Sequence, residues 1–296
     1  MRSGIFLQTI IGGIGIGSLY ALIALGYSMV YRSMGLVNFA QGSIYMVGTY
    51  FGIIWYAGIV MGLHVPYPVA LIIGILLNAM LGVLLERIFR PLAKLDLMFM
   101  LLGTIGLGFV LDNLFVIIFG AEGFAVTSPL PNAPLVVFGI RILPQMLLLI
   151  GGSALLMLGL QVFLKRTRSG KAMRASAMDN EIASTMGIPV NRMNALTLAI
   201  GSGLAAAAGI LAAPIVYVNP AMGSAVGLKG FAAAILGGLG SIPGAIVGGL
   251  VFGVLEAVSA GYISSSYTRG IAFLIMVVVL MVKPSGLVGE VTVEKV

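Results

Sequence analysis

The sequence predicts an all-α protein, a polytopic bundle of transmembrane helices, and three observations support this fold class. Of the 296 residues, 60% are hydrophobic and only 8% are charged, whereas soluble domains carry about 25% charged residues. About eight apolar segments follow one another, most of them long enough to cross a membrane. The 42 glycines fit helices that pack through small residues in lipid. A single transmembrane domain over residues 1–296 is expected.

The apolar segments are separated by short polar connections. They lie near residues 5–30, 36–61, 67–85, 97–119, 143–164, 194–217, 228–260 and 270–282. The first exceeds the apolar core of a signal peptide, about 7–15 residues, so it is interpreted as a span. The seventh contains GSIPG at 240–244, and Pro243 with Gly240 and Gly244 predicts a broken helix there. Its role is a hinge or part of a substrate path, because freed backbone groups must be buried or line a cavity.

Basic residues in the connections predict the orientation, since cytoplasmic loops are enriched in Lys and Arg. Residues 165–192 hold six of the sixteen Lys and Arg residues. Three connections are expected inside: the turn with Arg32, the loop with Arg87, Arg90 and Lys94, and residues 165–192. Two are expected outside: the loop with His64 and the loop at 120–142. The N-terminus is therefore expected outside. Lys283 favours a cytoplasmic C-terminus, which requires residues 228–260 to cross twice or to re-enter.

One face of the second span is polar or small. At helical spacing this face carries Asn38, Gln41, Gly42, Tyr45, Thr49 and Gly52. Such a stripe is costly in a membrane unless it meets a partner helix or a water-filled path. Both interpretations stay open, and Asn38, Gln41, Tyr45 and Thr49 are substrate-path candidates.

A short motif occurs twice, as VNFAQGS at 37–43 and VNPAMGS at 218–224, with five of seven residues shared. The first copy opens a span from the inside and the second opens one from the outside. Opposite polarity is what an inverted-topology repeat around a central site requires. An inverted repeat and coincidence are both open, and Asn219 joins the substrate-path candidates.

The seventh segment combines a small-residue ladder with two charges. Small residues recur every four positions, at Ser241, Ala245, Gly249, Gly253 and Ala257, which favours close packing of another helix. Lys229 and Glu256 lie 12 and 15 residues from position 241, so a turn there would bring them to similar depth. An ion pair is the hypothesis, and separate snorkelling to headgroups is the alternative.

Several classes of function find no support in the sequence. Cysteine is absent, and His64 is the only histidine, without neighbouring ligands, so no metal or other cofactor is expected. GGIGIG at 12–17 lies inside a span and SGKA at 169–172 lacks the P-loop pattern. The net charge of +7 comes without the aromatic and basic clusters of nucleic-acid binding. No catalytic constellation predicts an enzyme. Asp112 with Asn113, near the outer end of the fourth span, is interpreted as a solvated helix end, and contact with a partner outside is the alternative.

Residues 165–193 form the most unusual connection, and a capped helix is predicted within it. Asp179 is a candidate N-cap and Glu181 then lies in the first turn, where the helix dipole favours an acid. Gly187 suits the C′ position and Pro189 prevents continuation. A plain connector needs only a few residues. The chain shows no ATPase motif of its own, so an ordered cytoplasmic segment suggests a docking site for a separate subunit that supplies energy.

This segment resembles the coupling region of bacterial ABC-importer permeases. GKAMRASAMDNEIASTMGI, residues 170–188, fits the pattern GxAxRAxAxDxExAxxxGI, and Glu181, Ala183 and Gly187 match the loose EAA…G motif. GSLYALIALGYSMVYRSMGLVNFAQGSIYMVGTY and GLKGFAAAILGGLGSIPGAIVGGLVFGVLE resemble the branched-chain amino acid permease family, H-subunit type, so that nearly the whole chain is covered.

The resemblance implies a multi-subunit importer in the bacterial inner membrane. A second permease subunit (a paralogue or a second copy), two cytoplasmic ABC ATPases and a periplasmic binding protein would be the partners. ATPase-coupling residues would include Gly170, Arg174, Asp179, Glu181, Ala183 and Gly187. The alternative for Lys165, Arg166 and Arg168 is contact with anionic lipid.

The chain departs from the family where NFAQGS replaces the common NFAHGE, so Gln41 and Ser43 stand in for a histidine and an acid. This leaves the substrate open: branched-chain or other hydrophobic amino acids come first, and urea or short amides are the alternative. An ion-coupled secondary transporter, a membrane-embedded enzyme and a passive channel are the rival classes. ATP dependence without sensitivity to ion gradients would separate the importer from the secondary transporter.

Overall fold

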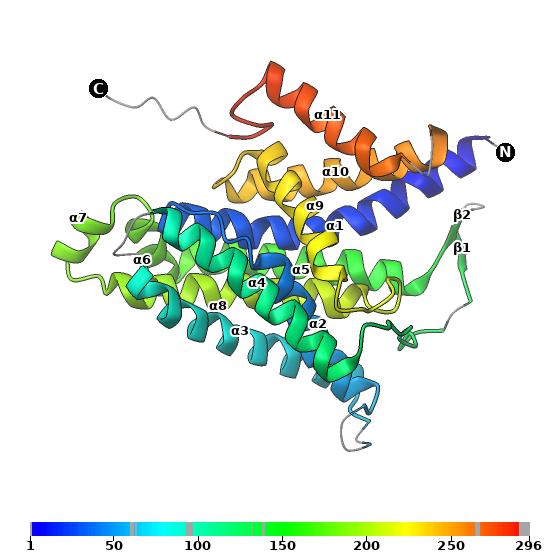
Figure 1. Cartoon of the computed structure of the whole chain (residues 1–296). Helices are drawn as coiled ribbons and strands as arrows, with labels where there is room; N and C mark the ends of the chain where they lie inside the picture. Colours follow the sequence, from blue (N-terminus) through cyan, green and yellow to red (C-terminus); the bar gives the residue numbers. More distant parts are fainter. Residues whose placement is uncertain are drawn as a thin grey trace.

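The computed structural model describes residues 2–59, 62, 64–92, 97–131, 133–137, 140–263 and 267–289. Its helices are α1 (Arg2–Met34), α2 (Gln41–Tyr56), α3 (Tyr67–Leu92), α4 (Leu97–Phe119), α5 (Pro144–Arg166), α6 (Arg168–Ser176), α7 (Asn180–Thr185), α8 (Val190–Ala212), α9 (Met222–Gly237), α10 (Ile242–Tyr262) and α11 (Thr268–Val282). Within the described ranges, α1, α3, α4, α5, α8 and α10 are long and apolar enough to span a membrane. The prediction of an all-α, polytopic transmembrane bundle is confirmed (Figure 1).

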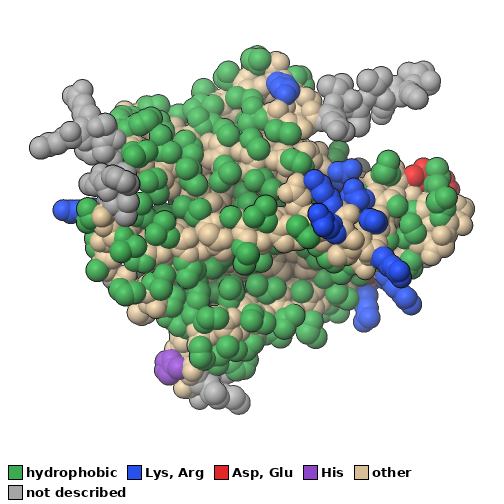
Figure 2. All heavy atoms as spheres, turned by 180° about the vertical axis from the view of Figure 1, so that it is seen from behind, with side chains coloured by type: hydrophobic (Ala, Val, Ile, Leu, Met, Phe, Trp, Pro, Cys, Tyr) green, Lys and Arg blue, Asp and Glu red, His purple; other side chains and the backbone are tan. Residues whose placement is uncertain are grey.

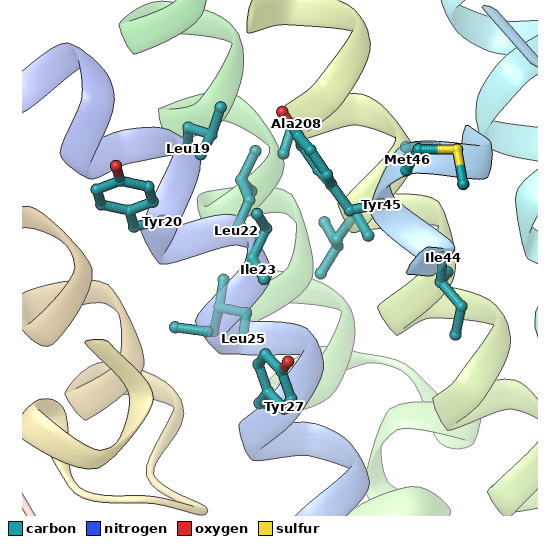
Figure 3. Packing of buried hydrophobic residues seen from close by; sticks show 14 of the residues in the cluster. Leu19, Tyr20, Leu22, Ile23, Leu25, Tyr27, Ile44, Tyr45, Met46 and Ala208 are labelled. Atoms are coloured by element: carbon teal, nitrogen blue, oxygen red, sulfur yellow. The ribbon is translucent and has the colours of Figure 1, made fainter. Parts of the chain in front are cut away.

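Helices α1 and α8 form the centre of the bundle. Within the most apolar 18-residue window of each helix, 83% of α8 and 67% of α1 is buried, whereas only 22% of α4 is buried. Buried side chains of α1 and α2 pack around this centre, and the Tyr45 ring of α2 lies beside Ala208 of α8 (Figure 3). The outer helices α3, α4 and α5 expose large apolar side chains, as expected of surfaces that face lipid.

The small-residue ladder of α10 packs against α1. A Cβ at Gly249 would collide with the backbone of Ala21, and one at Gly253 would collide with the backbone of Gly17. The two helices therefore approach closely, as small residues allow in membranes. This close approach positions Glu256, one turn further along α10, beside α1.

The seventh apolar segment is two antiparallel helices, α9 and α10, joined by a turn at residues 238–241. The turn depends on glycine, because Gly238 and Gly240 have φ values of 109° and 89°, which disfavour side chains. Pro243 lies in the first turn of α10, where proline is tolerated, and the Ser241 side chain caps that helix. The break is thus real, but Gly238 and Gly240 cause it rather than Pro243.

The C-terminal segment covers this turn, which lies at one end of the bundle. The amides of Leu287 and Val288 donate to the carbonyls of Leu236 and Gly237, at 2.8 and 3.0 Å. Gly240 lies near Tyr31 of α1, close to the end of that helix. The break expected near residues 240–244 is therefore present, close to the end of α1, and the carbonyls of Leu236 and Gly237 are satisfied by the chain itself.

The opposite end of the bundle carries the long connection between α4 and α5. A hairpin of β1 (Leu135–Val137) and β2 (Ile140–Ile142) projects there, and a bridge pairs Phe124 with Val218. Lys and Arg side chains gather at the other end, around α6 and α7 (Figure 2). This asymmetry agrees with the orientation predicted from the loops; Lys94, which contributed to that prediction, lies outside the described residues.

Candidate functional site

Helices α6 and α7 with the residues after them form a protrusion, here named the knob (residues 168–188). The Asp179 side chain accepts a hydrogen bond from the Ile182 amide at 2.9 Å and so caps α7. Gly187 ends the segment with a φ of 82°, a conformation that favours glycine. The capped helix predicted from residues 179–189 is confirmed as a structural element.

Short-range contacts attach the knob to the membrane helices. Gly170 packs on the carbonyl of Phe163 in α5, where a Cβ would collide, and Ala183 is buried. The Asn180 amide nitrogen donates to the Ser33 carbonyl at 3.5 Å, and the Ser33 hydroxyl donates to Asn194 at 2.6 Å. These two bonds connect the start of α7 with the end of α1, and the end of α1 with the start of α8.

The tip of the knob is apolar and exposed. Met178, Ile182 and Met186 are 82%, 59% and 79% exposed, although they surround the charged Asp179 and Glu181. The predicted residue Arg174 is also exposed, in the last turn of α6. Clustered exposed apolar side chains rimmed by polar residues are typical of protein interaction sites.

The polar stripe of α2 lies in a seam with α8 and α3. The Gln41 amide donates to the Gly201 carbonyl at 3.2 Å, and the Thr49 hydroxyl bonds back to Tyr45 of its own helix. Asn38 is 1% exposed and its Oδ1 accepts from the Ala40 amide. Of the two interpretations left open for this stripe, the structure supports the helix seam, and a substrate-path role for these residues stays a prediction.

Two side-chain amides missed by the sequence reasoning join helices to α8, one in this seam and one from α5. The Asn78 side chain of α3 donates to the carbonyls of Ile44 and Ser202, at 3.1 and 2.7 Å. Gln145 of α5 donates to the Leu211 carbonyl at 2.9 Å. Each is an amide in an apolar run, and that isolation was the available signal.

The two copies of the repeated motif occupy equivalent places and meet. Helix α2 begins at Gln41 and α9 begins at Met222, the fifth residue of each copy. The backbone amides of these two first residues bond in the same way: each donates to the carbonyl of the motif asparagine, Asn38 or Asn219, at 3.1 and 3.2 Å. A Cβ on Gly42 would collide with the Gly223 carbonyl. Equal helix starts that cross inside the bundle are what an inverted repeat predicts.

A cavity of about 250 Å³ lies beside this crossing and is named here the α2–α4–α9 cavity. Its lining includes Ser43 of α2, Ser224 of α9 and Asp112 of α4. Asp112 is half-buried and shares the cavity lining with Ser43, and its Oδ1 is buried without a partner among the described residues. The interpretation of Asp112 as a solvated helix end is therefore wrong; only Asn113, which bonds to the carbonyl of Phe109 in its own helix, is exposed.

The charges of α9 and α10 lie side by side. Lys229 Nζ is 2.5 Å from Glu256 Oε1, and the Tyr20 hydroxyl of α1 donates to Glu256 Oε2 at 2.7 Å. Lys229 also approaches the Tyr20 hydroxyl at 3.1 Å and its ring face at 5.6 Å. The group borders a second cavity of about 350 Å³. The structure thus has the arrangement of the ion-pair hypothesis and adds a tyrosine that the sequence reasoning missed.

The described residues offer no group of three or more His, Cys, Asp or Glu side chains that could hold a metal ion. His64 lies at the outer end, with its Nδ1 3.4 Å from the Tyr56 carbonyl. The polar groups that the fold brings together are instead the knob, the α2–α4–α9 cavity and the Lys229 group.

Comparisons with known proteins agree on one family. The family model described as branched-chain amino acid transport system, permease component, matches residues 9–280. The high-affinity branched-chain amino acid transport system permease proteins LivH of Salmonella typhimurium and BraD of Pseudomonas aeruginosa are each 38% identical, over 98% of both chains. A probable LivH of Methanocaldococcus jannaschii is 31% identical over 94% of this chain and 91% of its own. The chain belongs to the permease-component family of branched-chain amino acid transport systems.

Proposed function

We propose that the chain is a membrane-spanning permease subunit of an ATP-driven ABC importer for amino acids. Branched-chain and other hydrophobic amino acids are the first substrates to test, because the similar permeases carry that substrate in their names. The observation that carries the proposal is the knob: an ordered, capped segment with an exposed apolar tip, tied to α1 and α8. Such a segment can receive force from a partner and pass it to the bundle.

The knob fits a cytoplasmic ATPase better than it fits the membrane surface. Met178, Ile182 and Met186 project beyond the bundle, beside Asp179 and Glu181, and anionic headgroups would repel those carboxylates. An apolar tip with acids suits a protein groove that has apolar walls and basic edges. Lys165, Arg166 and Arg168 lie nearer the bundle, where lipid contact is the alternative.

The complete importer would hold further subunits. A second permease, either a paralogue or another copy of this chain, would complete the membrane core. Two ATPases would dock on the cytoplasmic side, and an external binding protein would deliver the substrate. In this assignment the chain supplies the path and the coupling segment, while the partner ATPases hydrolyse ATP.

Capture of the ATPase from native membranes tests the docking step. Glu181→Arg reverses a charge on the knob, and Gly187→Pro forces a φ of about −65° where Gly187 has 82°. We expect the tagged wild-type chain to bring down an ABC ATPase and both variants to bring down less or to lose coupled uptake. Glu122→Arg, at the opposite end of the bundle, is the matched charge reversal and should leave capture intact.

Uptake by the reconstituted complex tests the class of transporter and the substrate. Leucine uptake should require ATP and should be insensitive to imposed proton and sodium gradients. If the purified chain alone takes up leucine when a proton or sodium gradient is imposed, it is a secondary transporter and the proposal fails. Urea and acetamide serve as competitors: inhibition by them, but not by leucine, would assign the short-amide alternative.

A further inference from the structure

The α2–α4–α9 cavity holds a carboxylate at membrane depth. Helix α4 is a candidate membrane span, and Asp112 lies seven residues before its outer end at Phe119, or about 10 Å along the axis. A carboxylate inside a membrane protein is costly, so it faces a partner or a functional path. Ser43 lines the same cavity as Asp112, while the Oδ1 of Asp112 has no partner among the described residues.

Aromatic rings form much of the remaining wall. Phe231 contacts Tyr27 with ring centroids 5.4 Å apart and contacts Phe39 at 5.8 Å, and all three rings line the cavity with Phe109. None of the described lining residues is Lys, Arg or His. A carboxylate among aromatic faces, without a basic residue, is the surrounding that binds organic ammonium groups.

We propose that this cavity binds the ammonium group of an amino acid during transport, with Asp112 as the counter-ion. Ser43 orients the carboxylate, and Ile105 and Leu228 with the rings contact an aliphatic side chain. The inference rests on the proposed function and adds a site for it. The cavity volume of about 250 Å³ suits one small amphipathic molecule, near the range of known ligand pockets.

The cavity also lies where a transported molecule could pass. The first turns of α2 and α9 border it at the crossing of the two motif copies, the place where inverted-repeat transporters hold their substrate. Phe39, Phe109 and Leu228 on its rim are 43%, 65% and 56% exposed. The cavity is therefore open on one side of the bundle.

Because the chain has no cysteine, a single introduced thiol can report the charge inside the cavity. The background is Ser224→Cys in the complete importer in proteoliposomes, and Ala121→Cys, an exposed position at the opposite end of the bundle from the knob, is the control thiol. The measured quantities are rates of modification of this chain by cationic and anionic methanethiosulfonates of similar size. We expect the cationic reagent to be favoured at position 224, and Asp112→Asn to reduce that preference about tenfold or more. Asn113→Ala, on the neighbouring exposed residue, should leave the preference unchanged.

Protection of the same thiol identifies the ligand chemistry. Leucine and 3-methylbutylamine, which retain the ammonium group, should slow modification, whereas 4-methylpentanoate, which lacks it, should not. Asp112→Glu should retain part of the protection and Asp112→Asn should abolish it. In parallel, Asp112→Asn should reduce leucine uptake while the complex still hydrolyses ATP.

Three results would overturn the inference. Protection by 4-methylpentanoate alone would make the cavity an anion site. Protection by sodium ions, without an effect of the amine, would make it an inorganic cation site. If the Asp112→Asn complex keeps the reagent preference and full leucine uptake, the Asp112 carboxylate neither sets the charge inside the cavity nor binds the substrate. The proposed function fails separately, if the wild-type complex shows no ATP-dependent leucine uptake at all.

Discussion

Removing one charge of the Lys229–Glu256 pair should destabilise the bundle far more than removing both. The two side chains are 17% and 16% exposed and come from helices α9 and α10, with Tyr20 of α1 as a third partner. Breaking a buried pair leaves one uncompensated charge and costs about 3–5 kcal/mol, whereas replacing both partners is often nearly neutral.

The structure places the expected cost at the lower end of that range. The pair borders a cavity of about 350 Å³, so water can reach a charge left alone. We expect Lys229→Met and Glu256→Gln each to lower the free energy of unfolding by about 3 kcal/mol, a change of about 100-fold in the equilibrium constant. The double variant should lower the free energy of unfolding by only about 1 kcal/mol, mostly because the Tyr20 hydroxyl loses its contact with Lys229.

A double-mutant cycle measures this coupling. Unfolding of the purified protein in mixed micelles, by increasing the fraction of denaturing detergent, can be followed through Trp55, the single tryptophan. Tyr20→Phe removes one hydroxyl and serves as a comparison, with an expected loss of about 1 kcal/mol. Small single losses that simply add in the double variant would refute the reasoning, because residues that snorkel separately do not interact.

Two further predictions concern packing and hydrogen bonding. Gly253→Leu should prevent correct packing of α10 on α1, because any side chain there meets the backbone of Gly17. Recovery of folded protein by size-exclusion chromatography measures this effect. The control Gly159→Leu, where nothing lies within 4 Å of an added Cβ, should fold normally. Asn78→Leu removes two hydrogen bonds to backbone carbonyls and should cost about 1–2 kcal/mol in the same detergent assay. A neutral Asn78→Leu would mean that these carbonyls find other donors.

The membrane class, the succession of apolar segments and the capped helix of the knob were predictable from the sequence. Transfer into lipid depends on composition over a span of about 20 residues, which is a local property. The cap at Asp179 and the left-handed Gly187 act within one or two turns, so they too need no distant partner. The Lys229–Glu256 hypothesis was available from the sequence for a related reason, because it needed only the rise of two helices joined by a turn.

The surroundings of Asp112, Gln41 and Tyr20 were decided by tertiary structure. Asp112 looked like a helix end, but it lies beside Ser43, 69 positions earlier in the chain. Gln41 looked equally suited to a path or a seam until α8 brought the Gly201 carbonyl to it.

What the sequence determined by itself is therefore the class of protein, the order of its spans and the form of its knob. Only the tertiary structure decided which polar groups are satisfied by other helices and which remain facing a cavity. The physical reason is that helix crossings depend on shape matches such as Gly42 against Gly223, between residues far apart in the chain. Periodicity identifies the face of a helix but not the surface opposite that face.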